Sequence, residues 1–303
     1  MLSMLEAMPR FLPVEALAGG FAVNLWRNPN PQRHVIGRVG LIFLALRRLT
    51  LVALNTKTIS KDRPWTRLAI QLVQKFAELG TLDFLVMAFS RFYPNVLAIP
   101  ETWSGKDPET GKFRPLMYLL WFPFYFVEHS MFRRIVRQIL SKPKPFLDKY
   151  NLIDSTDGRN VYVGMWPSFF DCELPPHIGM VLDLSNDWEE SNIVLRGREY
   201  VCCPVWDQTI PLNKERFVRA VLAAADFDGN LYIHCGFGVG RSVQAAVAVL
   251  VRRGIVSGWE EGFKKVKAAR PFVELRPEAQ AFLAEIVPRL QAREERNEVE
   301  SEA

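Results

Sequence analysis

The sequence predicts an α/β domain with a largely parallel sheet in its second half, preceded by an apolar, basic, helical N-terminal region. Between about residues 151 and 292, short apolar runs of strand length alternate with helical stretches. Such alternation is typical of parallel sheets whose strands are linked by helices. The segment SKPKP, residues 141–145, has the composition of a linker. We therefore expect three regions: 1–145, 146–292 and a charged, frayed tail over 293–303.

The predicted strands are short apolar runs, and the predicted helices carry apolar residues on one face. The strands are expected at 160–164, 178–184, 199–205 and 231–234. The helices are expected at 213–227, 241–253, 258–269 and 277–291. Helices of this number and length would flank a central, mostly parallel sheet.

The first half of the chain is basic and the second is mildly acidic. Residues 1–150 hold 21 lysine and arginine residues against 10 aspartate and glutamate, whereas residues 151–303 hold 17 against 23. The basic charges are interleaved with apolar runs and form no recognition helix, which argues against nucleic acid as a partner. The whole first half shows no run of 18 uncharged apolar residues, so no transmembrane helix is predicted.

Two alternatives remain open for the N-terminal region. The aromatic segment 115–127 and the basic segment that follows it resemble an anchor at a membrane surface. The same residues would also suit core helices of a soluble domain. The first 60 residues are basic enough for a mitochondrial transit peptide, although Gly19 and Gly20 interrupt an amphipathic helix there.

The four cysteines indicate a reducing, intracellular compartment. They form no disulfide framework and no CxxC pair, so free thiols are the simpler interpretation. Cys202 and Cys203 are expected to be buried strand residues, with a resolving thiol for Cys235 as the alternative.

The most informative segment is residues 231–250, LYIHCGFGVGRSVQAAVAVL. A buried strand leads into a glycine-rich loop, and a helix begins directly after that loop. Glycines allow successive backbone N–H groups to turn around an anion, and the helix N-terminus adds positive partial charge. The residues expected to bind a phosphate group are Gly236, Phe237, Gly238, Val239, Gly240 and Arg241.

Four side chains of this segment have expected roles. The surroundings should lower the pKa of the Cys235 thiol, which makes it an ionised nucleophile. Arg241 offers a fork of donors that suits two phosphate oxygens. Ser242 can reach the sulfur and stabilise it as a leaving group, while His234 is expected to orient the loop. This chemistry requires no metal and no organic cofactor.

The segment HCGFGVGRS, residues 234–242, resembles the His-Cys-x5-Arg-Ser signature of protein-tyrosine and dual-specificity phosphatases. The similarity covers about 155–290, including VYVGMWPS at 161–168, VLDLS at 181–185 and RPFVELRPEAQAFL at 270–283. This resemblance implies the cysteine-phosphatase fold, a catalytic domain of dual-specificity type and a phosphocysteine intermediate.

The resemblance also implies a general acid about thirty residues before the cysteine. Asp207, in CPVWDQTIP, stands 28 positions before Cys235 and is the preferred candidate. Asp226 and Asp228 are alternatives, but they lie in a turn where aspartate is expected for structural reasons. Asp183 is expected to end a strand. Gln280 is either a residue that positions water or a surface residue of a helix.

The expected substrate is a phosphomonoester. The phosphate loop contains no lysine, which argues against highly phosphorylated inositol lipids. Phosphotyrosine or phosphoserine/threonine on proteins is the preferred class. The alternatives are a membrane-associated lipid phosphatase, similar to those that act on phosphatidylglycerophosphate, and a non-catalytic phosphate-binding scaffold.

Overall fold

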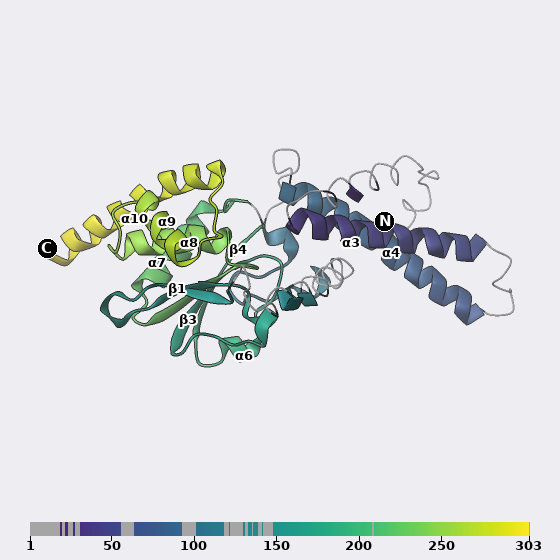
Figure 1. Ribbon diagram of the computed structural model, residues 1–303, viewed down its shortest axis with the longest axis horizontal. Coiled ribbons are helices and arrows are strands. Elements are labelled where there is room, and N and C mark those ends of the chain that lie inside the picture. The colour runs from purple at the N-terminus through teal and green to yellow at the C-terminus, as the bar shows by residue number, and fades with distance from the viewer. Residues whose placement is uncertain are drawn as a thin grey trace. The chain divides into compact units, whose positions relative to one another are not determined.

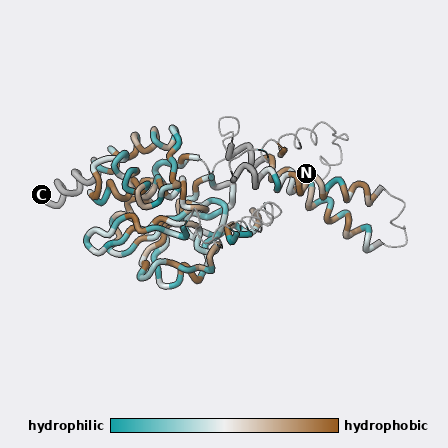
Figure 2. The backbone as a smooth tube through the Cα atoms, viewed as in Figure 1, coloured by the Kyte–Doolittle hydropathy of each residue, from teal (hydrophilic) through white to brown (hydrophobic). Residues whose placement is uncertain are grey.

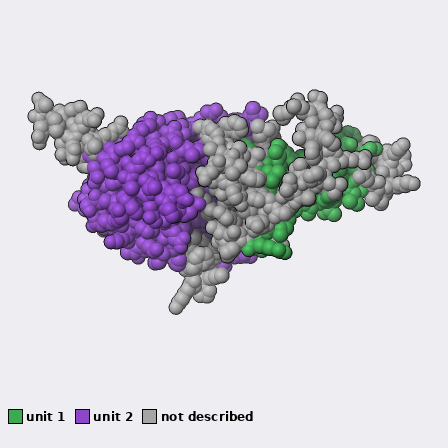
Figure 3. All heavy atoms as spheres, turned by 90° about the horizontal axis from the view of Figure 1, so that it is seen from above, with its two compact units in different colours: residues 1–98, 119–134 green, residues 99–118, 135–303 purple. Residues whose placement is uncertain are grey.

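The computed structural model describes residues 31–55, 64–92, 101–117, 148–207 and 209–302, with isolated residues at 19, 22, 23, 27, 121, 130, 133, 134, 136–138 and 141. The chain divides into two compact units, shown in Figure 3. The first contains residues 1–98 and 119–134, and the second contains residues 99–118 and 135–303. The second unit therefore includes residues 99–118, which lie before the predicted boundary at 145. The reason is that this stretch forms buried hydrogen bonds with residues 183–190.

The second unit contains a five-stranded sheet in the order β1-β2-β5-β3-β4. β2, β5, β3 and β4 are parallel, and β1 is antiparallel to β2. The strands are β1 (Tyr150–Asp154), β2 (Val161–Gly164), β3 (Ile178–Ser185), β4 (Glu199–Val205) and β5 (Asn230–His234). The predicted α/β class, with a mostly parallel sheet flanked by helices, is confirmed.

Four helices gather on one face of this sheet (Figure 1). They are α7 (Lys214–Asp226), α8 (Arg241–Arg252), α9 (Trp259–Ala269) and α10 (Pro277–Glu302). Helix α8 is buried on almost every side because it touches the sheet and the other three helices, which explains its alanine- and valine-rich sequence. The other face is covered by the short helix α6 (Asn192–Leu195), whose Val194 packs beside Val181 and Tyr232.

Three shorter segments complete the second unit. They are the 3-10 turns η1 (Glu101–Ser104), η2 (Thr156–Gly158) and η3 (Pro167–Phe170). An isolated bridge between Lys106 and Phe113 closes a small antiparallel turn after η1.

Two elements differ from the sequence-based expectation. Strand β1 was not predicted, because YNLID mixes polar and apolar residues and only part of this edge strand is buried. Helix α10 continues to Glu302, whereas a frayed tail was expected from residue 293. Arginine and glutamate are good helix formers, so REERNEVE can extend a helix that has already begun.

In the first unit, helices α3 (Pro31–Asn55) and α4 (Pro64–Phe92) pack along each other. The ring of Phe84 lies against Gly40, and the ring of Phe43 lies against Gly80. A Cβ atom at either glycine would approach the facing ring to 2.6 Å or less, so the close packing depends on these two residues. No helix in the described part of the chain is long and apolar enough to cross a bilayer. Most of the predicted anchor, 115–127, and most of the linker, 141–145, lie outside the described residues.

Candidate active site

The candidate site lies at the edge of the sheet where the parallel strands end. Cys235 follows the last residue of β5, and Asp207 follows the end of β4. Because these strands are parallel, both residues lie at the same edge, the usual place for ligand sites in such sheets. Asp226 and Asp228 precede β5 and therefore lie at the opposite edge, about 13 Å away along a strand of this length. The structure thus brings Asp207, and neither alternative, to the cysteine.

The loop after Cys235 is held from outside through its carbonyl groups. The backbone N–H of Trp166 donates to Gly236 O at 3.0 Å. The buried Arg270 donates from Nε to Gly238 O at 2.7 Å and from Nη2 to Phe237 O at 2.9 Å. In a planar trans peptide the N–H points opposite to the C=O, so the N–H groups of these peptides point away from Trp166 and Arg270. This is the orientation that an anion-binding loop requires.

The three loop glycines have different structural roles. Gly238 adopts a φ of 68°, and a Cβ there would meet Gly164 O at 2.4 Å. A Cβ at Gly236 would meet the ring of Trp188 at 2.6 Å. Gly240 has open space around it. The loop therefore requires glycine at 236 and 238 and does not require it at 240.

Cys235 is buried at the start of the loop, with its Sγ 3.4 Å from Ser242 Oγ. Burial alone would raise the pKa of the thiol, but the Arg241 charge and hydrogen bonds from Ser242 outweigh it and hold the pKa of Cys235 below its usual value. Helix α8 begins at Arg241 with no side-chain cap, so its N-terminal dipole also favours an anion here. The pKa of Cys235 is thus shifted downwards, the direction that the sequence predicted.

Arg241 lies between two carboxylates. Its Nη1 donates to Asp187 Oδ2 at 2.9 Å and to Val205 O at 2.8 Å, and its Nη2 lies 3.0 Å from Asp207 Oδ1. Although burial opposes the charge, the two carboxylates raise the pKa of Arg241 above its usual value. The Asp187 side chain is 2% exposed and that of Asp207 is 15% exposed, so Asp207 lies on the more accessible side. Asp187 was missed in the sequence, since no local pattern distinguishes it.

His234 is fully buried behind the loop. Its Nε2 is 3.1 Å from Glu190 Oε2, and its Nδ1 is 3.3 Å from Cys235 O. Burial would lower the pKa of this imidazole, but Asp183 and Glu190 raise it above its usual value. A protonated ring is attracted to the Glu190 carboxylate and can donate a hydrogen bond through Nδ1 to the Cys235 carbonyl. This geometry supports the orienting role expected for His234.

Aromatic side chains pack around the loop. Trp166 and Trp188 stack with ring centroids 5.3 Å apart, and Phe169 packs edge-on against both. The half-buried Phe237 lies 5.9 Å from Phe169, measured between ring centroids. Trp166, Phe169 and Trp188 are buried, and Phe237 is the half-buried member of this cluster.

Cys202 and Cys203 lie on β4, and β3 separates them from β5, the strand that Cys235 follows. Two strand spacings amount to about 9.6 Å, which exceeds the Cα separation of a disulfide. Burial raises the pKa of Cys202 to about 12. A resolving role for either thiol is therefore excluded in this arrangement. Gln280 is exposed and donates to Leu275 O, as a surface residue of α10 would.

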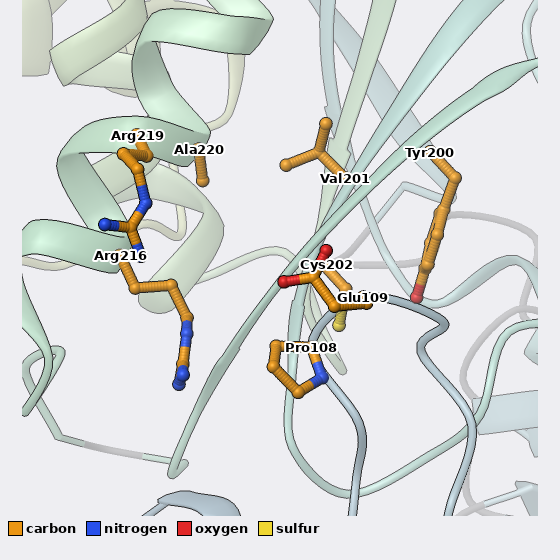
Figure 4. A pocket seen from close by; sticks show the side chains of 8 residues that line it. All are labelled: Pro108, Glu109, Tyr200, Val201, Cys202, Arg216, Arg219 and Ala220. Carbon is orange, nitrogen blue, oxygen red and sulfur yellow. The ribbon is translucent and has the colours of Figure 1, made fainter.

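A separate hollow of about 200 Å³ lies beside edge strand β4 (Figure 4). None of its lining residues belongs to the phosphate loop: they are Pro108, Glu109, Tyr200, Val201, Cys202, Arg216, Arg219 and Ala220. Within the described ranges, no three histidine, cysteine, aspartate or glutamate side chains are grouped as metal ligands.

Comparison with known proteins finds similarity among solved structures only. No family model matches the chain, and no curated protein does. The structure of PTPMT1 in complex with PI(5)P matches at 21% identity over 48% of this chain and 99% of that one, with a TM-score of 0.38. Human DUSP28 matches at 19% identity, over 50% and 99%, with a TM-score of 0.39. A mouse putative dual specificity phosphatase complexed with zinc tungstate matches at 22%, over 50% and 94%, with a TM-score of 0.39.

Of these neighbours, the mouse protein is described as a putative dual specificity phosphatase. The similarity spans about half of this chain.

Proposed function

We propose that this chain is a cysteine-dependent phosphatase that hydrolyses phosphomonoesters through a phosphocysteine intermediate. One observation carries the proposal: a buried thiol of lowered pKa lies 3.4 Å from a serine hydroxyl, at a helix N-terminus whose first residue is a buried arginine. Such a site binds an anion and attacks it with sulfur.

In the first step, the Cys235 thiolate attacks phosphorus, and the bond between phosphorus and the ester oxygen breaks. The electron pair of that bond leaves with the oxygen, which takes a proton from Asp207. The products are the free alcohol and phosphocysteine. Arg241 and the loop N–H groups stabilise the equatorial oxygens of the transition state.

In the second step, a water molecule attacks phosphorus and gives its proton to the Asp207 carboxylate. The S–P bond breaks and its electron pair returns to Cys235 as the thiolate, which Ser242 stabilises by donating a hydrogen bond. Inorganic phosphate leaves, and Asp207 is again protonated for the next cycle.

The preferred substrates are phosphotyrosine and phosphoserine/threonine on proteins. A loop whose one charged member is Arg241 suits a single phosphate group better than a polyphosphorylated headgroup. The half-buried Phe237, a residue of the loop itself, can pack against a tyrosyl ring. A reducing, intracellular compartment is part of the proposal, because the mechanism needs a thiolate and the four cysteines form no disulfide.

The test is phosphate release by the full-length protein and its Cys235→Ser variant. The panel contains a phosphotyrosine peptide, a phosphothreonine peptide, and vesicles of phosphatidylglycerophosphate or phosphoinositides. Turnover of a peptide that disappears in Cys235→Ser supports the proposal. A protein inert towards every phosphoester would refute it and favour the phosphate-binding scaffold.

A second candidate, a lipid phosphatase at a membrane surface, is favoured by the hairpin of α3 and α4. Figure 2 shows apolar residues along both helices, and several are exposed. On α4, Trp65, Leu68 and Leu72 follow helical spacing, and Trp65 is 80% exposed. On α3, Leu49 is exposed beside Arg48, in a helix without a single acidic residue. An apolar stripe with cations suits an anionic bilayer.

Substitution of Trp65 and Leu68 by glutamate separates the two candidates. A lipid enzyme would lose turnover of vesicle-embedded substrate and retain turnover of a small soluble ester. Equal rates before and after substitution on both substrates would exclude the membrane role of this hairpin.

A further inference from the structure

The end of β3 and the loop that follows it, residues 185–190, are here called the β3 loop. An upstream segment, residues 101–113, forms hydrogen bonds with this loop. Ser104 Oγ donates to Asn186 Oδ1 at 2.5 Å, and Lys112 Nζ donates to Glu190 O at 2.7 Å. The contact partners are more than 75 residues apart in sequence. The upstream segment therefore belongs to the phosphate-site unit rather than to a separate N-terminal region.

Lys106 is the centre of this attachment. Its side chain is fully buried, and its Nζ donates to Asp183 Oδ2 at 2.6 Å, to Ser185 O at 2.7 Å and to Trp188 O at 2.7 Å. Three protons of an ammonium group are matched by three close oxygen atoms. Two of these oxygens are backbone carbonyls of the β3 loop, so Lys106 fixes the path of that loop between 185 and 188.

The β3 loop in turn contacts three residues of the phosphate site, Arg241, His234 and Gly236. Asp187 accepts a hydrogen bond from Arg241, and Glu190 lies 3.1 Å from the ring of His234. The ring of Trp188 fills the space against Gly236. One short loop thus positions the arginine, the histidine behind the cysteine and the first loop glycine.

We propose that Lys106 is a positioning residue for catalysis. By fixing the β3 loop, it keeps Arg241 and His234 in their positions next to the Cys235 thiolate. The proposal rests on the proposed phosphatase function, and it assigns a role in that chemistry to a segment outside the stretch that carries the signature. Lys106 acts only through the β3 loop and through Asp183.

Removal of the ammonium group has two physical consequences. The carbonyls of Ser185 and Trp188 lose their donor, so the loop that carries Asp187 can shift. The buried group of Lys106, Asp183, His234 and Glu190 also loses its charge balance and gains a net negative charge. Negative charge behind the loop disfavours a thiolate.

Other ionisable groups near Cys235 and His234 also contribute to the electrostatic potential at these two residues. They are Arg241 on α8, Asp207 after β4, Asp187 and Glu190 in the β3 loop, Arg270 after α9, and Asp183 and Tyr232 on the sheet. Tyr200 and Cys202 face Asp183 from β4.

The test uses full-length Lys106→Met. The first readout is the rate of Cys235 alkylation by iodoacetamide as a function of pH, with the modified peptide identified by mass spectrometry. The second is kcat/KM on a small aryl phosphate. Because an unbalanced buried aspartate can prevent folding, the double variant Lys106→Met/Asp183→Asn is measured beside it. Lys214→Met, which removes an exposed lysine paired with Glu285, is the matched control.

In a folded Lys106→Met protein we expect the alkylation midpoint to move to higher pH and kcat/KM to fall about 10- to 100-fold, the scale of a misplaced catalytic group. The double variant should recover thermal stability without recovering kcat/KM, because the carbonyl contacts remain lost. Lys214→Met should match the wild type in both readouts.

A purely structural lysine gives a different result. If the folded double variant has wild-type kcat/KM and a wild-type alkylation profile, Lys106 does not position the site and the proposal is overturned. If the wild-type protein releases phosphate from no ester, the proposed function fails instead. The alkylation profile of folded Lys106→Met, in which the charge of Asp183 is not balanced, then still decides the role of Lys106.

Discussion

Replacement of Arg241 by lysine separates the charge of this residue from its fork of donors. Arg241 uses Nη1 for Asp187 and Val205 O, and it directs Nη2 towards the accessible Asp207. A lysine carries three protons on one nitrogen, so it cannot serve Asp187, Val205 O and two phosphate oxygens at the same time. We therefore expect the phosphate to lose at least one transition-state donor while the positive charge beside Cys235 remains.

The size of the effect follows from the number of donors lost. One missing donor to a developing oxyanion costs about 10²–10³ in kcat, or roughly 3–4 kcal/mol. The stability loss should be smaller than in Arg241→Ala, where removal of the cation from the 2% exposed Asp187 carboxylate costs about 3–5 kcal/mol. The Cys235 alkylation profile of Arg241→Lys should stay near that of the wild type, because the cation persists.

The assay combines steady-state hydrolysis of a small aryl phosphate with urea unfolding of wild type, Arg241→Lys and Arg241→Ala. We expect kcat/KM of the wild type to be far above that of both variants. The free energy of unfolding should decrease from the wild type to the lysine variant and again to the alanine variant. A lysine variant that turns over at the wild-type rate would show that a point charge is sufficient. The bidentate role assigned to Arg241 would then be wrong.

Three further results are expected. Asp207→Asn should lower kcat by about 10²–10⁴, because the general acid is lost, whereas Asp226→Asn, at the opposite edge of the sheet, should leave kcat unchanged. Equal effects of the two substitutions would show that Asp207 is not the general acid. Gly238→Ala should lower the free energy of unfolding by about 1–3 kcal/mol through its positive φ and the contact with the Gly164 carbonyl, and urea unfolding should show a smaller loss for Gly240→Ala. Although burial favours its protonated form, Lys106 and His234 hold the pKa of Asp183 at about 2, so its ionisation stabilises the fold above about pH 4, and this stability is lost as the pH falls towards 2. Urea unfolding from pH 5 to pH 2 should therefore show a loss of about 2 kcal/mol that Asp183→Asn lacks.

The sequence predicted the parts of the fold that local patterns determine. Strands β3 and β5 are buried on both faces, so each reads as a continuous apolar run. The thiol, arginine and serine of the site lie within eight residues of one loop, which is why one segment revealed them. Strand β1 was missed because an edge strand with polar residues carries no such signal.

The missing parts of the site depend on contacts between distant residues. Lys106 meets Asp183 across 77 positions, and Asp187 meets Arg241 across 54. No spacing rule connects residues so far apart, since the topology of the sheet decides which loops meet. Asp183 was expected to be a structural residue at a strand end, and its buried pairing with Lys106 agrees with that prediction. Residues 99–118 group with the second unit through contacts of the same long-range kind.

The central claim is that Cys235 becomes covalently phosphorylated during turnover. Wild-type protein is mixed with a phosphorylated aryl substrate, quenched in acid within the first turnover, digested and analysed by mass spectrometry beside Cys235→Ser. The account predicts a phosphoryl group on the peptide that contains Cys235 in the wild type, and none in the variant. Turnover with no phosphoryl group on that peptide, or undiminished turnover by Cys235→Ser, would contradict it.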